Sequence, residues 1–265
     1  MRAPRLTVVL AVAALVAAVA MPLLAGSDTS ARQARVLVIS EARGYKHASI
    51  PDQVRFLRTL GRRSRRFDIV HLRRASDLTK TQLADSKAVV FASTTGELGI
   101  DDEIRQALID FVKDGGALIG LHSAANTFDR WPRFQRVLGA GFRRHPPAQV
   151  GRLVVADRRH PSTRRLPRAF RARDEFYEFK TSPRRRAHVL LRADPASISG
   201  ETRRDLPLAW CRREGRGRVF YSALGHFGAP LAPVGRRRPA LDPRPGWRPL
   251  RPLLESTGPP PWCSG

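Results

Sequence analysis

One histidine occupies the position that is best suited to catalysis. The apolar run 117–121 contains Gly120 and is followed directly by His122, and Ala124 stands two positions further on. Such a small-residue turn from a strand into a helix resembles a nucleophile elbow, which holds one side chain exposed above the sheet. Because imidazole does not keep an acyl group, general acid–base catalysis or metal ligation fits His122 better than acyl transfer. The alternative is a structural histidine that caps the helix start.

Four further histidines lie in loops, and three of them are candidate site residues; the fourth, His160, follows a different strand. His47 follows the first predicted strand, His226 follows the last one, and His145 precedes two prolines. Because parallel strands end at a common edge, His47 and His226 are expected at the same rim as His122. A cluster of three histidines can hold zinc with one open position, so His122, His145 and His226 are the candidate metal ligands. Taken singly, a loop histidine is more often a solvated surface residue.

Carboxylates and aromatic rings alternate over residues 174–178 (Asp-Glu-Phe-Tyr-Glu). Carboxylates beside aromatic rings suit the hydroxyls and the faces of sugars. Glu175 is therefore a candidate catalytic group, together with His122 and His226. The candidate substrate-binding residues are His47, Ser123, Trp131, His145 and Tyr177. An edge strand with outward-facing acids explains the segment equally well.

Apolar runs alternate with helical patterns in the first half of the chain. The runs 36–39, 67–70, 88–92 and 117–121 predict strands, and residues 50–60 and 101–113 predict helices. This alternation predicts an α/β fold with right-handed βαβ units and a mainly parallel central sheet flanked by helices. After residue 141 the pattern changes to short runs at 153–155, 176–179, 188–191, 206–211 and 218–223. We expect these runs to add antiparallel strands to the same domain.

Both ends of the chain differ from the middle. Arg2 and Arg5 precede an apolar run over residues 6–25, which predicts a signal peptide (1–25) before a polar linker (26–34). An uncleaved membrane anchor is the alternative. Either way, the protein is expected to be secreted or extracytoplasmic. Residues 229–265 contain ten of the 21 prolines and predict a disordered tail.

Composition excludes several function classes. Two cysteines are too few for a disulfide framework or a cysteine-based zinc module. The formal charge of +25 rests on 48 basic residues, of which only five are lysine. Arginines scattered along the chain are explained by a GC-rich coding bias as well as by a selected surface, so no nucleic-acid partner is expected. The glycine-rich segments do not match a P-loop or a dinucleotide fingerprint.

The motifs, taken in order, resemble those of the ThuA-like (trehalose utilisation) family over residues 35–228. The segments that carry the resemblance are 36–40, 44–50, 94–96, 115–124, Trp131, 139–147, 160–163, 166–167, 174–177, 207–211 and 217–226. The resemblance implies a flavodoxin-like fold of the class I glutamine amidotransferase type. It also implies a role in the use of trehalose or related disaccharides through 3-keto-sugar intermediates.

The same resemblance argues against glutaminase activity. It places His122 where a glutamine amidotransferase carries its nucleophilic cysteine, and His226 where that enzyme carries its catalytic histidine. Phe227 and Gly228 follow His226 where the third member, a glutamate, would stand.

Two main function classes follow, beside a weaker third, an arginine-rich polyanion binder whose binding would depend steeply on salt. The first is an enzyme, a hydrolase or isomerase, that acts on a sugar or keto-sugar through the histidines and Glu175. The second is a non-catalytic carbohydrate-binding module with Trp131, Phe176 and Tyr177 as its stacking surface. In both, the partner is a small carbohydrate, and a membrane is contacted only through an uncleaved N-terminal segment. Convergence of His122, His145 and His226 on one place would favour the enzyme.

Overall fold

The computed structural model describes residues 33–200 and 203–227. The predicted signal segment, nearly all of the predicted linker and the predicted tail lie outside these residues. None of the helices in the described ranges is long and apolar enough to cross a membrane.

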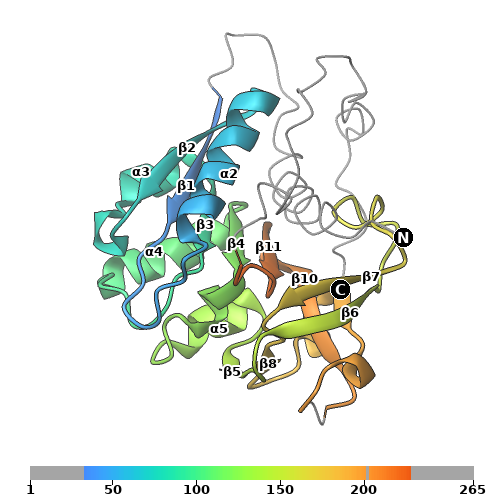
Figure 1. Cartoon of the computed structure of the whole chain (residues 1–265). Helices are drawn as coiled ribbons and strands as arrows, with labels where there is room; N and C mark the ends of the chain where they lie inside the picture. Colours follow the sequence, from blue (N-terminus) through green and yellow to red (C-terminus); the bar gives the residue numbers. More distant parts are fainter. Residues whose placement is uncertain (1–32, 201–202, 228–265) are drawn as a thin grey trace.

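One nine-stranded sheet organises the described chain (Figure 1). Its order is β2-β1-β3-β4-β11-β10-β9-β6-β7, and the first five strands are parallel while the last four alternate in direction. The strands are β1 (Ala34–Ile39), β2 (Phe67–Leu72), β3 (Ser86–Ala92), β4 (Ala117–Leu121), β6 (Gln149–Val155), β7 (Ala169–Asp174), β9 (His188–Ala193), β10 (Leu206–Glu214) and β11 (Gly217–Ser222). The parallel half has the 2-1-3-4-5 order of flavodoxin-like folds, which confirms the predicted fold class.

Within the described residues, the parallel half is accompanied by four α-helices: α2 (Ile50–Ser64), α3 (Lys80–Ala84), α4 (Asp102–Lys113) and α5 (Pro132–Leu138). Right-handed crossovers place α2 on one face of the sheet and α3 and α4, which pack together, on the other (Figure 1). α4 begins where Asp101 accepts a hydrogen bond from the Ile104 amide, with two acids in its first turn. Short 3₁₀ segments are η2 (Ala75–Asp77), η3 (His122–Asn126), η4 (Pro183–Arg185) and η5 (Pro195–Ser197).

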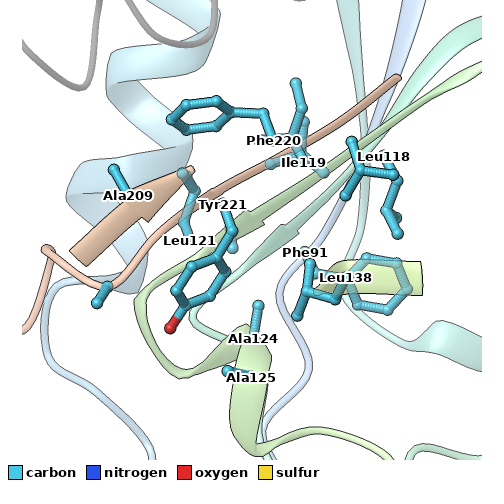
Figure 2. Close-up of a cluster of buried hydrophobic side chains, with 14 of the residues drawn as sticks. Phe91, Leu118, Ile119, Leu121, Ala124, Ala125, Leu138, Ala209, Phe220 and Tyr221 are labelled. Atoms are coloured by element: carbon cyan, nitrogen blue, oxygen red, sulfur yellow. The ribbon is translucent and has the colours of Figure 1, made fainter. Parts of the chain in front are cut away.

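The core fills both sides of the central strands. Every residue of β4 is buried, as expected for a parallel strand that is covered on both faces. Figure 2 shows this region, with Leu118, Ile119 and Leu121 of β4 beside Phe220 and Tyr221 of β11. The Trp210 ring stacks on Tyr221 with centroids 4.4 Å apart, and its indole N–H donates to the Leu138 carbonyl. Packing therefore fixes β10, β11 and the end of α5 relative to one another.

The C-terminal half departs from the predicted elements in one important place. Residues 176–179 were expected to form a strand, but only Glu178–Phe179 (β8) do, paired with β5 (Phe142–Arg144). The strand lies earlier, at β7, where apolar residues alternate with arginines and an aspartate. Residues 175–177 instead leave the sheet, because the side chain of Asp174 binds backbone amides of the loop after β11.

Candidate functional site

His122 sits at a strained turn directly after β4. Its φ is +49°, in the left-handed region that residues other than glycine rarely adopt. A Cβ atom on Gly120 would lie 2.7 Å from Leu138 Cδ1 and 3.3 Å from Ala124 Cβ. A side chain at position 120 would therefore overlap the packed core beside the turn, in agreement with the small-residue pattern of an elbow. The turn leads into the 3₁₀ segment η3, and its first residue is His122.

The His122 side chain is fully buried and fixed in orientation. Its Nδ1 lies 2.7 Å from the Ala223 carbonyl oxygen, which can only accept, so Nδ1 carries a proton. Nε2 then faces the Tyr177 hydroxyl at 3.1 Å and Glu175 Oε2 at 3.4 Å. The Tyr221 hydroxyl donates to the His122 carbonyl at 2.6 Å, and Figure 2 shows this ring extending from β11. Nε2 is therefore the atom free to exchange a proton.

Three histidines converge on one carboxylate. Glu175 Oε1 lies 3.0 Å from His226 Nδ1 and 3.5 Å from His145 Nε2, while Oε2 faces His122. His47 joins the group by ring contacts, with its centroid 4.5 Å from that of His122 and 5.2 Å from that of His226. The site histidines expected from sequence, His47, His122, His145 and His226, are thus together with Glu175. We call these five residues the histidine cluster.

Four members of the cluster lie close enough together that they could hold a metal ion after a small rearrangement. Donor atoms of His47, His122, Glu175 and His226 all lie within 4.8 Å of one another. Tetrahedral zinc with bonds of about 2.0–2.1 Å needs donor atoms roughly 3.3 Å apart, so a modest inward movement would be required. His226 Nδ1 is buried without a hydrogen-bond partner, because its contact with Glu175 is not aligned for one. An orphaned imidazole nitrogen beside a carboxylate suits a metal ligand.

The residues that the structure brings together as possible metal ligands differ from those expected from the sequence, which are His122, His145 and His226. His47 and Glu175 stand with His122 and His226, while His145 is outside the four-donor group. His145 Nδ1 lies 2.9 Å from the Pro146 carbonyl oxygen, and its Nε2 lies beside Glu175. His145 is thus a neighbour of the carboxylate in this geometry.

Burial and neighbouring charges set the protonation states. Burial, followed by the charges of His122 and His226, lowers the pKa of His47 to about 4. Burial alone would raise the pKa of Glu175, but the hydrogen bond from His122 and the charges of His145, His122 and His226 outweigh it, and the pKa is lowered. Near pH 7 the cluster therefore contains a neutral His47 and an ionised Glu175.

Asp174, to which the sequence assigns no role beyond its place in the acidic segment 174–178, is central to the site. Its carboxylate accepts hydrogen bonds from the backbone amides of Gly225 at 2.9 Å, His226 at 3.2 Å and Glu175 at 2.9 Å. Burial raises its pKa. One side chain thereby ties the loop that carries His226 to the segment that carries Glu175. The only sequence signal was its position beside Glu175.

Gln53 of α2 makes a second unexpected link. Its Nε2 donates to Ser93 Oγ at 2.7 Å and to the Gly225 carbonyl at 3.1 Å. Ser93, directly after β3, has a left-handed φ of +49°. Gln53 therefore connects the loops after β3 and β11 on the side of His122.

The remaining expected residues have different environments. Ser123 is buried, and its Oγ lies 3.2 Å from His47 Nδ1. Tyr177 is also buried, and burial followed by nearby charges raises its pKa, so it stays protonated beside His122. Phe176 is fully buried, so Phe176 and Tyr177 do not form an exposed stacking surface.

Trp131 lies in a hydrophobic cluster at the start of α5. Its ring centroid is 5.2 Å from that of Phe128 and 5.6 Å from that of Phe134. No ring contact, hydrogen bond or ion pair within the described ranges joins it to the histidine cluster. The structure thus places Trp131 in packing, apart from the site expected for it.

Comparisons with known proteins agree with this fold. A ThuA-like protein from Bacteroides uniformis ATCC 8492 matches with a TM-score of 0.62 and 23% identity, over 78% of this chain and 87% of that chain. A second ThuA-like protein, from Parabacteroides merdae ATCC 43184, matches with a TM-score of 0.62 and 22% identity, over 75% and 81% of the two chains. None of the curated proteins compared with the chain matches it.

The family model named ThuA and described as trehalose utilisation matches residues 35–232. This range contains all but the first two described residues and every member of the histidine cluster. The sheet order and the elbow are compatible with the class I glutamine amidotransferase type of fold. A match over more than half of the sequence establishes the family: the chain belongs to the ThuA (trehalose utilisation) family.

Proposed function

We propose that this protein is an exported enzyme that acts on a disaccharide of the trehalose type or on its 3-keto derivative. The observation that carries the proposal is the convergence of His122, His145 and His226 on Glu175 at the carboxyl edge of the parallel strands. Flavodoxin-like folds bind their ligands at this edge. The family description supplies the substrate class.

Proton transfer at His122 Nε2 is the chemistry that this geometry favours. When His122 is neutral, Nε2 accepts a hydrogen bond from Tyr177; when it is protonated, Nε2 can donate to Glu175. The Ala223 carbonyl holds Nδ1 in both states. His122 can thus take a proton from a sugar hydroxyl or from a carbon next to a keto group, and return it elsewhere on the substrate. An isomerase or a hydrolase would use such a step.

A divalent metal such as zinc is the alternative to proton transfer at His122, because Nε2 cannot accept a proton while it binds a metal. His47, His122, Glu175 and His226 would hold it. When bound, it would supply Lewis-acid polarisation of a substrate oxygen. The neutral state of His47 favours this role, because a metal-ligating imidazole must be deprotonated.

Glutaminase activity is not proposed, because a histidine stands at the elbow in place of a cysteine. Cys211, the one cysteine in the described ranges, is a buried residue of β10 near His160. An imidazole cannot replace the thiolate that forms a stable acyl-enzyme.

The test is a turnover and metal assay of the purified protein. Trehalose, its 3-keto derivative and other disaccharides are supplied, and bound metal is measured by mass spectrometry. The variants are His122→Ala and its matched control His188→Ala, since His188 is an exposed histidine that pairs with Asp157. We expect turnover to fall in His122→Ala alone. Sugar binding without turnover in the wild type would point to the carbohydrate-binding module instead.

Export is a separate part of the proposal. It is based on the basic and apolar segment at residues 1–25. Cell fractionation of the full-length protein tests it, with a variant that lacks these residues as the control. Full-length protein found wholly in the soluble cytoplasmic fraction would contradict it.

A further inference from the structure

Two exposed aromatic side chains border the histidine cluster. The described ranges contain three exposed large apolar side chains, Tyr45, Val150 and Phe227. Tyr45 and Phe227 both contact the His226 ring. The Tyr45 ring lies 6.4 Å from it with planes 16° apart, and the Phe227 ring lies 4.7 Å from it at 77°. A large aromatic group left in water beside a polar cluster is typical of a ligand-binding surface, and Tyr45 is the more open of the two, because the Arg173 guanidinium lies 4.5 Å from the centroid of the Phe227 ring.

The Tyr45 ring is held in place although it is 66% exposed. The buried Thr95 hydroxyl donates to the Tyr45 carbonyl at 3.0 Å and accepts from the Gly44 amide at 3.1 Å. The ring also meets His47 edge-on, with centroids 4.7 Å apart. Because backbone and ring are fixed before any ligand arrives, little conformational entropy is lost on binding.

Exposure within the cluster shows which side a ligand can reach. The exposed fraction of the side chain rises from 0% at His122 to 10% at Glu175, 18% at His226 and 32% at His145. His122 is thus the deep end of the cluster. The accessible end includes His226, and Tyr45 stacks over this residue. A ligand that approaches Glu175 on this side meets the Tyr45 ring.

We propose that Tyr45, assisted by Phe227, is an aromatic binding surface for the apolar face of a pyranose ring next to the histidine cluster. The inference rests on the proposed function and adds a substrate-binding site to it. A sugar ring has faces lined by C–H groups and an edge of hydroxyls. An aromatic plane beside imidazoles and a carboxylate matches both properties, because one binds the face and the others bind the hydroxyls.

The test measures binding of trehalose, its 3-keto derivative and glucose by calorimetry to the full chain. The variants are Tyr45→Ala, Tyr45→Phe, Phe227→Ala and the control Val150→Ala, which removes an exposed apolar side chain without a ring contact to His226. We expect Tyr45→Ala to weaken binding by about threefold to tenfold, and Phe227→Ala to weaken it less. Tyr45→Phe and Val150→Ala should bind as the wild type does. Circular dichroism verifies folding of each variant.

The outcomes separate this inference from the proposed function. If the wild type binds a sugar and Tyr45→Ala binds it equally well, the aromatic surface is refuted and the enzyme proposal stands. If turnover depends on His122 and Tyr45→Ala raises KM, both hold. If the wild type binds none of the three sugars, both are overturned.

Discussion

Glu175 Oε1 lies 3.0 Å from His226 Nδ1, although the strands that precede these residues, β7 and β11, are separated by three strands in the sheet. The end of the sheet must therefore curl back towards the centre of its own carboxyl edge. Asp174 makes this approach possible, because it binds the amides of Gly225 and His226 directly. The antiparallel half of the sheet thus brings a carboxylate to histidines that the parallel half supplies.

Glu175→Gln should lower turnover by about 10²–10⁴-fold and reduce bound metal, since the amide can neither stabilise a charged His122 nor serve as an anionic ligand. Steady-state kinetics and metal analysis on the same preparation check this. Glu103→Gln on the exposed surface of α4 is the matched control and should change neither. Full activity in Glu175→Gln would exclude the carboxylate from the chemistry.

The parallel half of the fold could be predicted from the sequence because its strands are continuous apolar runs. Val36–Ile39, Ala88–Ala92 and Ala117–Leu121 each match a buried parallel strand. The loops that follow parallel strands must share one edge, so His47, His122 and His226 could be placed together. For these three histidines, the local sequence pattern and the topology of the sheet predict the same position.

The contribution of the antiparallel half could not be predicted in the same way. β7 reads Ala-Phe-Arg-Ala-Arg-Asp, and its arginines conceal the alternation of a strand that is covered on one face. Nothing local to Asp174 indicates that its partners are amides some fifty residues later. Trp131 was assigned to the site but packs in the core, because an isolated aromatic residue in a sequence is compatible with core packing and with sugar stacking alike.

Gly120→Ala should destabilise the protein by about 1–3 kcal/mol, because the new methyl group would overlap Leu138 and Tyr221 in a packed core. Urea unfolding followed by fluorescence measures this. Gly44→Ala is the control, since its Cβ would meet only ordinary contacts of 3.4 Å or more, and it should change stability by less than about 0.5 kcal/mol. An unaffected Gly120→Ala would mean that the core around Leu138 and Tyr221 accepts a methyl group at this position.

Stability should fall as the pH decreases from about 6.5 to 4 in metal-free protein, because unfolded His47 binds a proton in this range while folded His47, with a pKa of about 4, does not. The lowered pKa of His47 makes the free energy of unfolding above pH 6.5 larger than that below pH 4 by on the order of 3 kcal/mol. The lowered pKa of Glu175 also decreases stability as the pH falls, at pH values around and below the usual pKa of a glutamate. The raised pKa of Asp174 has the opposite effect, because the folded protein then binds a proton more readily than the unfolded chain does. Urea unfolding in the presence of a chelator measures the slope. His47→Asn should flatten the slope between pH 4.5 and 6.5, and an unchanged slope would contradict the assignment.

Asp174→Asn tests whether the cluster is held together by one buried carboxylate. The wild-type side chain accepts three backbone N–H groups, and Asn would turn two donor hydrogens towards at least one of them. We expect a loss of about 1–3 kcal/mol of stability from the unsatisfied donor. Because the His226 loop would then be free to move from Glu175, metal affinity or turnover should also fall by about 10–100-fold per folded molecule.

Asp157→Asn is the control, at an aspartate that pairs with His188 away from the cluster. It separates the effect on stability from the effect on turnover, since it should leave turnover unchanged. Loss of stability in Asp174→Asn with full turnover per folded molecule would reduce Asp174 to a structural residue.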